Sequence, residues 1–258
     1  MLYKRDLVDI LKHHLSSDYH LIIIGARQTG KTSLLLFLEQ ELKKTQRVYY
    51  ISLEDPDFLA LLSAHPDNLF DIIGHDQEQA IVLIDEIQYL NDPSHFLKYH
   101  FDFNRKKIKL IVTGSSAFYL DQKFKDSLAG RKRIFFLTPL NLNEILLFKG
   151  IKIPDLLIDE QNFIKYPLLY RKEMHSLIKE ILVYGSYPAV VLENNKEEKK
   201  DILFDLVDSY TRKDILEYGI RGRESYYKFL KLLASQNGNL INKSELSSTD
   251  RKSTRLNS

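Results

Sequence analysis

The stretch that decides the fold is Leu21-Ile22-Ile23-Ile24, followed at once by Gly25-Ala26-Arg27-Gln28-Thr29-Gly30-Lys31-Thr32. The four aliphatic residues predict a buried β-strand, and the run from Ser33 to Leu42, which contains no Gly or Pro, predicts a helix. The segment between them has the spacing Gly-x-x-x-x-Gly-Lys-Thr. A glycine-containing turn of this spacing between a strand and a helix is typical of a loop that wraps phosphate groups.

Each fixed position of this loop has a physical task. The two glycines lack a Cβ, so the backbone can adopt conformations in which successive N–H groups point inward. We expect Lys31 to reach the β- and γ-phosphates of a nucleotide and the Thr32 hydroxyl to bind Mg²⁺. The N-terminus of the following helix adds its unpaired N–H groups to the same anion site. The predicted nucleotide-binding residues are therefore Gly25, Ala26, Arg27, Gln28, Thr29, Gly30, Lys31, Thr32 and Ser33.

A second aliphatic run, from Ala80 to Ile84, ends in two carboxylates, Asp85 and Glu86. Such a run is typical of a strand that is buried on both faces of a parallel sheet. Open sheets of this kind bind ligands at the carboxyl ends of their strands, so we predict that Asp85 is the Walker B acid that holds Mg²⁺. Glu86 is placed to orient or deprotonate the attacking water as a general base. The alternative is that both carboxylates simply begin a loop.

The segment Lys109 to Ser116 repeats the pattern of an aliphatic strand followed by small polar residues. If this strand lies beside the one that ends in Asp85, either Thr113 or Ser115 comes near the γ-phosphate. We predict that this residue is a sensor that helps to hold the hydrolysing water in line, with Thr113 as the candidate catalytic residue. A polar turn without contact to the nucleotide is the alternative.

Arg131 follows Leu128-Ala129-Gly130 and precedes the last predicted strand, Ile134 to Leu137. A guanidinium that reaches the transferring phosphoryl oxygens can raise turnover by about 10³–10⁵-fold, so Arg131 is a candidate catalytic residue. An ordinary exposed arginine before a strand is the alternative. The sequence does not say whether Arg131 acts on the nucleotide of its own chain or on that of a neighbour.

Strands and helices alternate only as far as about residue 138, which divides the chain. We expect a P-loop ATPase core over 1–138, a small helical lid over 139–195 and a helical extension over 196–249. A polar segment over 194–200 is expected to be a hinge. Residues 250–258 are polar and without periodicity, so we expect them to be disordered; they also resemble a translated sequencing adapter and could be non-native.

Composition narrows the function classes. The chain has 258 residues, 44% of them hydrophobic, and no Cys, which excludes disulfides and thiolate chemistry. The eight histidines show no metal-binding spacing, and a net charge of +2 argues by itself for neither nucleic acid nor a membrane surface. The segment from Lys196 onward contains 13 Lys and Arg residues and 10 Asp and Glu residues. This mild excess allows a DNA or protein contact in the C-terminal helical part, with a solvated helical surface as the alternative. No apolar run suggests a signal peptide or a membrane span, so we expect a cytoplasmic protein.

The motifs GARQTGKTSLL, VLIDEIQYL, IVTGSSA, LAGR and PLNLNEIL occur in this order. Together they resemble the AAA-type ATPase domain of a widespread prokaryotic family, over about residues 5–246. The resemblance implies an αβα sandwich, α/β in class, with parallel strand order 5-1-4-3-2 and a helical lid. It implies Walker A roles for Lys31 and Thr32, Walker B roles for Asp85 and Glu86, and, less directly, roles for Thr113 and Arg131. A winged helix would begin at LINKSELS, where the chain departs from the pattern because the recognition helix, the wing and a further C-terminal domain are missing.

We therefore predict a Mg²⁺-dependent ATPase that hydrolyses ATP to ADP and phosphate. ATP is favoured over GTP because no strand ends in an Asn-Lys-x-Asp pattern that reads guanine. The alternative from another class is a nucleotide-gated switch module that binds DNA or a protein partner and hydrolyses ATP only slowly. A P-loop kinase is a weaker third interpretation, because Asp85-Glu86 suits the activation of water better than transfer to an acceptor. The oligomeric state is left open.

Overall fold

The computed structural model describes residues 2–75, 78–115, 128–151, 168–217 and 223–236. The chain forms two compact units, residues 1–194 and residues 195–258.

The first unit is built on a five-stranded sheet in which every pairing is parallel. Its strands are β1 (His20–Gly25), β2 (Arg47–Ser52), β3 (Ala80–Asp85), β4 (Ile108–Ser115) and β5 (Lys132–Leu137). The strand order is β2-β3-β4-β1-β5, which confirms the predicted order 5-1-4-3-2, counted from the other edge. Because the strands run in the same direction, the carboxyl ends of β1, β3 and β4 lie at one edge of the sheet.

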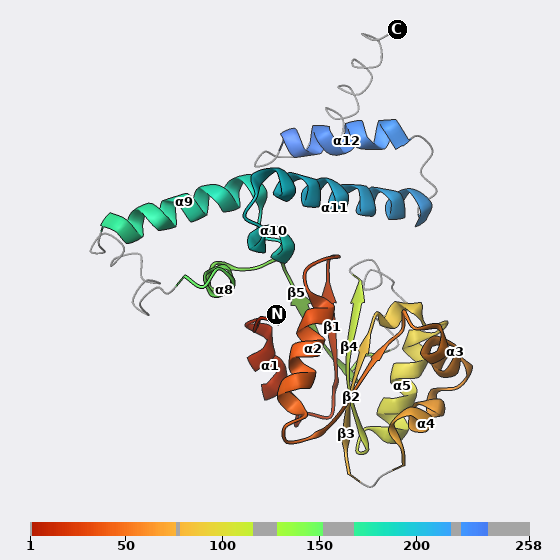
Figure 1. The fold of residues 1–258 in the computed structure, drawn as a ribbon. Helices are drawn as coiled ribbons and strands as arrows, with labels where there is room; N and C mark the ends of the chain where they lie inside the picture. Colours follow the sequence, from red (N-terminus) through yellow and green to blue (C-terminus); the bar gives the residue numbers. More distant parts are fainter. Residues whose placement is uncertain (1, 76–77, 116–127, 152–167, 218–222, 237–258) are drawn as a thin grey trace. The chain divides into compact units, whose positions relative to one another are not determined.

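Helices cover both faces of this sheet (Figure 1). One face carries α1 (Leu7–His13) and α2 (Lys31–Leu42), and the other carries α3 (Pro56–Ala64), α4 (Leu69–Ile73) and α5 (Pro93–Asn104). Short 3-10 helices η1 (Pro66–Asn68) and η2 (Ile87–Tyr89) join these elements. The predicted three-layer αβα sandwich is therefore confirmed.

Alternating residues of β1 supply the two hydrophobic cores of this sandwich. Leu21 and Ile23 pack with the buried residues of α1 and α2, whereas Ile22 and Ile24 pack with those of the other helix layer. Because both faces of the strand are covered, every residue of β1 is buried. This explains why the strand is an unbroken aliphatic run and not an alternating one.

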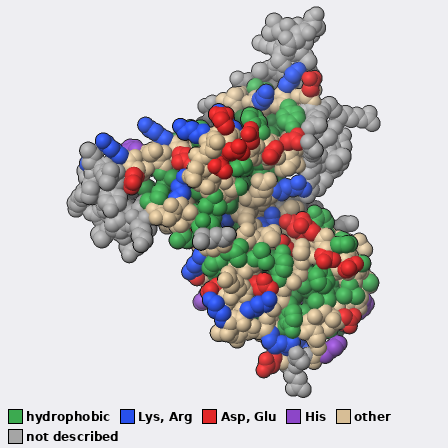
Figure 2. All heavy atoms as spheres, in the orientation of Figure 1, with side chains coloured by type: hydrophobic (Ala, Val, Ile, Leu, Met, Phe, Trp, Pro, Cys, Tyr) green, Lys and Arg blue, Asp and Glu red, His purple; other side chains and the backbone are tan. Residues whose placement is uncertain are grey.

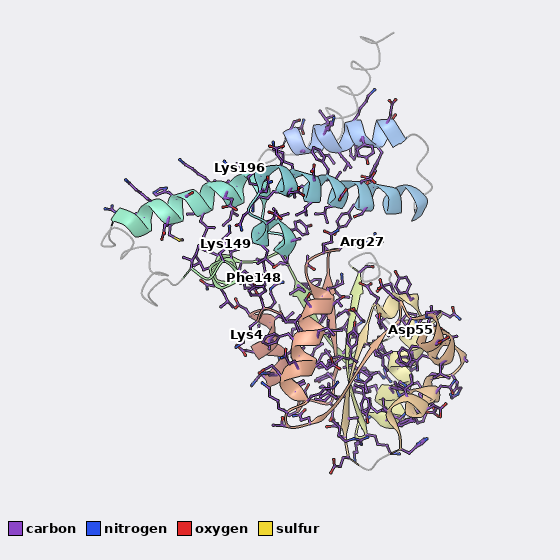
Figure 3. The ribbon with its side chains drawn as sticks, in the orientation of Figure 1. Lys4, Arg27, Asp55, Phe148, Lys149 and Lys196 are labelled. Atoms are coloured by element: carbon purple, nitrogen blue, oxygen red, sulfur yellow. The ribbon has the colours of Figure 1, made fainter. Side chains whose placement is uncertain are left out.

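A small helical part completes the first unit. It contains α8 (Leu142–Phe148), α9 (Leu168–Tyr184) and α10 (Pro188–Leu192). Their shared core consists of Leu140, Ile145, Phe148, Met174, Leu177 and Val191. The Tyr3 ring stacks on Phe148, which Figure 3 labels on α8, with 4.4 Å between the ring centroids. The N-terminal segment therefore packs against this helical part as well as against the sheet.

The second unit is described over two helices, α11 (Lys196–Glu217) and α12 (Arg223–Ser235). They are linked by the Tyr227 hydroxyl, which donates to Asp208 Oδ1 at 2.8 Å. The division between the two units falls after Asn194, inside the segment 194–200 that we expected to be a hinge, and α11 begins two residues later at Lys196. The predicted start of a winged helix at 240–247 and the tail 250–258 lie outside the described residues.

Charged side chains of both signs are interspersed on the face shown in Figure 2. Such mixing agrees with the near-neutral balance of the sequence, whose net charge is +2. Among the helices that the structure describes, none combines the length and the apolar character that a membrane crossing requires.

Candidate nucleotide-binding site

The loop after β1 has a backbone that ordinary residues disfavour. Gln28 and Gly30 have positive φ angles, +59° and +91°. A Cβ at Gly25 would lie only 2.6 Å from the Leu137 carbonyl oxygen and 2.9 Å from Thr29 Oγ1, so only glycine fits at that position. The Thr29 hydroxyl donates to the Ala26 carbonyl at 2.8 Å and closes the loop on itself. The turn is thus tight and internally braced.

Helix α2 begins directly at this loop. Its N-cap is Gly30, and no side chain among the described residues caps its first turn. The helix therefore offers backbone N–H groups and the positive end of its dipole to the loop, as an anion site requires. Arg27 lies in the loop itself, between β1 and α2 (Figure 3).

Lys31 is buried although it is charged, with 5% of its side chain exposed. Its ammonium donates to the carbonyl oxygens of Gly25 at 3.2 Å and Ala26 at 3.1 Å. The same nitrogen lies 3.9 Å from Glu86 Oε1. Because a buried ammonium needs several acceptors, these contacts hold the cation at the mouth of the loop.

The Asp85 carboxylate is the centre of the site. It is buried at the end of β3 and accepts three hydroxyl hydrogen bonds. Thr32 donates to Oδ2 at 2.6 Å, Tyr50 donates to the same oxygen at 3.2 Å, and Thr113 donates to Oδ1 through a short hydrogen bond. The predicted proximity of the β3 carboxylate to the loop after β1 is thus visible in direct contacts.

Tyr50 was missed by the sequence analysis. It lies on β2 opposite Leu83 of β3, two residues before the strand ends. Burial raises the pKa of the Tyr50 hydroxyl, and the nearby charge of Asp85 raises it further, so the phenol remains a donor at neutral pH. The signal that could have revealed Tyr50 in the sequence was a tyrosine, with its hydroxyl donor, near the carboxyl end of the strand that precedes β3.

Glu86 is held in an unusual backbone conformation, with φ at +59°, which costs free energy for a residue with a side chain. Its N–H donates to Thr113 Oγ1 at 2.9 Å, and its Oε2 accepts a short hydrogen bond from the Gln88 amide. Gln88 Oε1 in turn accepts from the Ser115 N–H at 3.2 Å. Glu86 is therefore tied to the end of β4 through its backbone and through Gln88.

Thr113, the predicted sensor, lies between the two acids of the site. It is fully buried, and its hydroxyl binds the Asp85 carboxylate and the Glu86 N–H. In this arrangement Thr113 positions the two acids. Ser115, the other sensor candidate, contributes its backbone N–H to Gln88.

Arg131 lies at the opposite edge of the sheet. Its carbonyl accepts from the N–H of His20, the first residue of β1, whereas the phosphate loop follows the last residue, Gly25. A strand of this length spans about 17–20 Å, which is more than an arginine side chain can reach. The guanidinium instead donates to Asp102 Oδ1 at 2.8 Å. Arg131 therefore lies too far from the loop to reach the nucleotide of its own chain, which leaves a role toward a neighbouring chain or that of an ordinary exposed arginine.

The residues present fit the groups that the sequence analysis predicted. Thr32 and Asp85 bring a hydroxyl and a carboxylate oxygen within 2.6 Å of each other, and hard oxygen ligands of this kind suit Mg²⁺. The braced loop, the N-terminus of α2 and the Lys31 ammonium suit an anion with several phosphates.

A parallel sheet of this order, with such a loop after β1, defines a P-loop nucleotide-binding domain. The chain belongs to the AAA family of P-loop ATPase domains, because the model described as "AAA domain" matches residues 17–146. A second model, described as a domain of unknown function, matches residues 175–256.

An uncharacterized protein of Methanocaldococcus jannaschii is 25% identical over 196 residues, which cover 76% of this chain and 42% of that protein. The chain thus spans less than half the length of this relative.

Three solved structures also match with low identity. PCH-2 of C. elegans is 14% identical, with a TM-score of 0.49 over 81% of this chain and 69% of that chain. The Aeropyrum pernix ORC1 protein in complex with DNA is 13% identical, with a TM-score of 0.46 over 98% and 78%. AMPPCP-bound DnaA from Aquifex aeolicus is 19% identical, with a TM-score of 0.43 over 96% and 86%.

Proposed function

We propose that this chain binds Mg²⁺·ATP at the 25–32 loop and hydrolyses it to ADP and phosphate. The observation that carries this proposal is the gathering of Lys31, Thr32, Asp85 and Glu86 at the carboxyl edge of the sheet. Asp85 accepts from Thr32 at 2.6 Å, and Glu86 lies 3.9 Å from the Lys31 ammonium. A cation-binding pair, a phosphate-binding ammonium and a further carboxylate are thus adjacent, as phosphoryl transfer requires.

The binding roles follow from the contacts. The loop N–H groups and the N-terminus of α2 bind the phosphate oxygens, and Lys31 neutralises their charge when its ammonium exchanges the carbonyls of Gly25 and Ala26 for phosphate. Thr32 and Asp85 would hold Mg²⁺, which when bound neutralises the charge that develops on the phosphate oxygens.

Glu86 supplies the base. Its carboxylate accepts a proton from water as that water attacks the γ-phosphorus, and the bond to the ADP oxygen breaks. Thr113 and Gln88 hold Glu86 from two sides, so the carboxylate is oriented before the water arrives. General-base catalysis of this kind contributes about 10²–10⁴-fold in rate.

In this proposal, any catalytic role of Arg131 is directed at the nucleotide of a neighbouring chain. The guanidinium is partly exposed, with 31% of the side chain accessible, and is bound by the Asp102 carboxylate at the edge of the first unit. We propose that it serves the nucleotide of a neighbouring chain, so turnover would depend on self-association.

Nucleotide titration tests the binding claim. Labelled ATP and GTP are titrated with and without Mg²⁺ into the wild-type chain, Lys31→Ala and the control Lys43→Ala, which lies just after the other end of α2. We expect tight binding of ATP over GTP, lost in Lys31→Ala and kept in Lys43→Ala. Equal affinity for both nucleotides, or unchanged affinity in Lys31→Ala, would contradict the proposal.

A second candidate function is a nucleotide-gated switch with slow hydrolysis. It is favoured by the separate unit 195–258, in which a cavity of about 380 Å³ is lined by Glu224, Tyr227, Lys228 and Lys231 of helix α12. In this version the helical part over 139–195 is a lid that ATP holds closed, and the second unit binds DNA or a protein partner. Turnover with and without duplex DNA separates the two: stimulation by DNA supports a coupled DNA partner, and a slow rate indifferent to DNA counts against it.

A further inference from the structure

Arg5 is a buried arginine outside the predicted site, with 4% of the residue exposed. Each of its three nitrogens has a different acceptor. Nε donates to Glu144 Oε1, one terminal nitrogen donates to the Thr29 carbonyl of the phosphate loop, and the other donates to the Thr138 carbonyl after β5, all at 2.8 Å. One guanidinium thus joins the phosphate loop, the end of β5 and helix α8.

The bond to Thr29 bears directly on the donors of the loop. In a trans peptide unit the C=O of one residue and the N–H of the next point in opposite directions. Because the Thr29 carbonyl points to Arg5, the Gly30 N–H points away from Arg5. Gly30 also packs beside this guanidinium, since a Cβ there would lie 3.7 Å from its terminal nitrogen and 3.9 Å from Pro188 Cγ at the start of α10. Arg5 therefore fixes the rotation of the peptide unit just before α2.

Glu144 holds the other side of Arg5. Its carboxylate also accepts the backbone N–H groups of Asp6 at 2.9 Å and Asn141 at 3.1 Å, and the latter bond is part of the capping box of α8. Burial opposes the ionisation of Glu144, but the hydrogen bonds from Arg5, Asp6 and Asn141 outweigh it and lower its pKa. The guanidinium and the carboxylate are each fixed by further groups, so the pair is a rigid support.

We propose that Arg5 is a positioning residue for phosphate binding, which aims the Gly30 N–H into the phosphate loop and couples that loop to α8 through Glu144. This inference rests on the proposed function, because it assigns the support of the same nucleotide site. The inference goes beyond the proposed function because it makes the affinity for phosphate depend on the N-terminal segment and on α8.

Arg5→Lys tests this inference, because it keeps the positive charge beside Glu144 but replaces the three donor nitrogens of the guanidinium by a single ammonium nitrogen. The binding of ATP and of tripolyphosphate, which has no base or ribose, is measured by calorimetry well below the melting temperature. The matched control is Arg133→Lys, an exposed arginine that contacts His14 away from the loop. We expect Arg5→Lys to bind both ligands about tenfold more weakly, as the loss of one charge-assisted hydrogen bond predicts, and Arg133→Lys to match the wild type.

The outcomes separate this inference from the proposed function. If the wild type binds neither ligand, the proposed function fails. If the wild type binds and folded Arg5→Lys binds equally well, with only a lower melting temperature, Arg5 is merely structural and the inference is overturned. If Arg5→Lys does not fold, Glu144→Gln is tested instead. This change keeps the size of the side chain and its acceptor oxygen but removes the negative charge that holds the Arg5 guanidinium. We expect it to bind tripolyphosphate about threefold more weakly; wild-type affinity in folded Glu144→Gln would also overturn the inference.

Discussion

The Thr32 hydroxyl donates to Asp85, with 2.6 Å between Oγ1 and Oδ2. This bond joins the first turn of α2 to the end of β3, so the two residues proposed as Mg²⁺ ligands already face each other across the edge of the sheet. The arrangement brings the ligands together without any movement of the backbone.

Thr32→Val removes this oxygen while keeping the size and the branched shape of the side chain. We expect the gain in ATP affinity that Mg²⁺ provides to fall by about tenfold, because one ligand of the ion is lost. The measurement is the ratio of the ATP dissociation constants with Mg²⁺ and with EDTA. Thr45→Val, an exposed change after α2, is the control. An undiminished Mg²⁺ effect in Thr32→Val would contradict the assignment of this hydroxyl.

Tyr50→Phe removes the third hydroxyl that orients Asp85, 3.2 Å from Oδ2. We expect kcat/KM to fall by about 3–10-fold, since hydrogen bonds to a charged group are worth about 1.5–3 kcal/mol and two others remain. ATP binding in EDTA should be unchanged. Tyr49→Phe is the matched control, because the Tyr49 hydroxyl contacts Arg47 and not Asp85. Steady-state rates equal to the wild type in Tyr50→Phe would show that Asp85 needs no third donor.

His100 makes stability depend on pH. It is fully buried, and burial lowers its pKa to about 4, although the Pro66 carbonyl that its Nε2–H faces at 3.0 Å raises it in part. Below pH 6.5, the ordinary pKa of histidine, His100 is protonated in the unfolded chain but stays neutral in the folded chain. Stability is therefore lost as the pH falls from about 6.5 to about 4. Urea unfolding should therefore show about 2 kcal/mol less stability at pH 5 than at pH 7 from this residue.

The variant His100→Gln checks this directly, because glutamine can still donate to the Pro66 carbonyl but does not titrate. We expect it to lose most of that difference between the two pH values, whatever its stability at pH 7. His95→Gln, on an exposed turn of the same helix, is the control and should keep the wild-type difference. A His100→Gln variant with the full wild-type pH dependence would show that other groups cause it.

Arg131→Ala separates a role between chains from a purely structural one. Its ion pair with Asp102 is about one-third exposed on both sides, so its loss should change stability by less than about 1 kcal/mol. If Arg131 serves a neighbour, the turnover per chain should rise with protein concentration in the wild type and not in Arg131→Ala. Turnover that is the same in both proteins at every concentration would make Arg131 an ordinary surface residue.

The sheet and the phosphate loop could be predicted because local patterns determine them. The aliphatic runs before Gly25 and Asp85 can be buried on both faces only in a parallel sheet, and the loop spacing is itself local. Helix α5 was not predicted, because His, Lys and Asp interrupt its apolar residues. Its start is nevertheless marked by Asp92, which accepts from the His95 N–H at 2.8 Å, and by Pro93 at the first position.

The contacts that support the site could not be predicted in the same way. Tyr50 and Asp85, and still more Arg5 and Glu144, are brought together by the fold and not by spacing. Arg131 is a different case, since a residue just before a parallel strand must lie at the amino edge of the sheet. By that rule alone Arg131 lies far from the 25–32 loop, which follows a strand. The rule would have excluded a catalytic role for Arg131 at the nucleotide of its own chain.

The central claim, hydrolysis of ATP with Glu86 as the base, is tested most directly by the ATP turnover of Glu86→Gln beside its ATP affinity. The account predicts that binding survives, because Lys31, Thr32 and Asp85 remain, while turnover falls by about 10²-fold or more. Asp85→Asn should instead weaken both the Mg²⁺-dependent affinity and the rate, and Glu54→Gln, a carboxylate after the neighbouring strand β2, should match the wild type. Hydrolysis at the wild-type rate in Glu86→Gln would contradict the account.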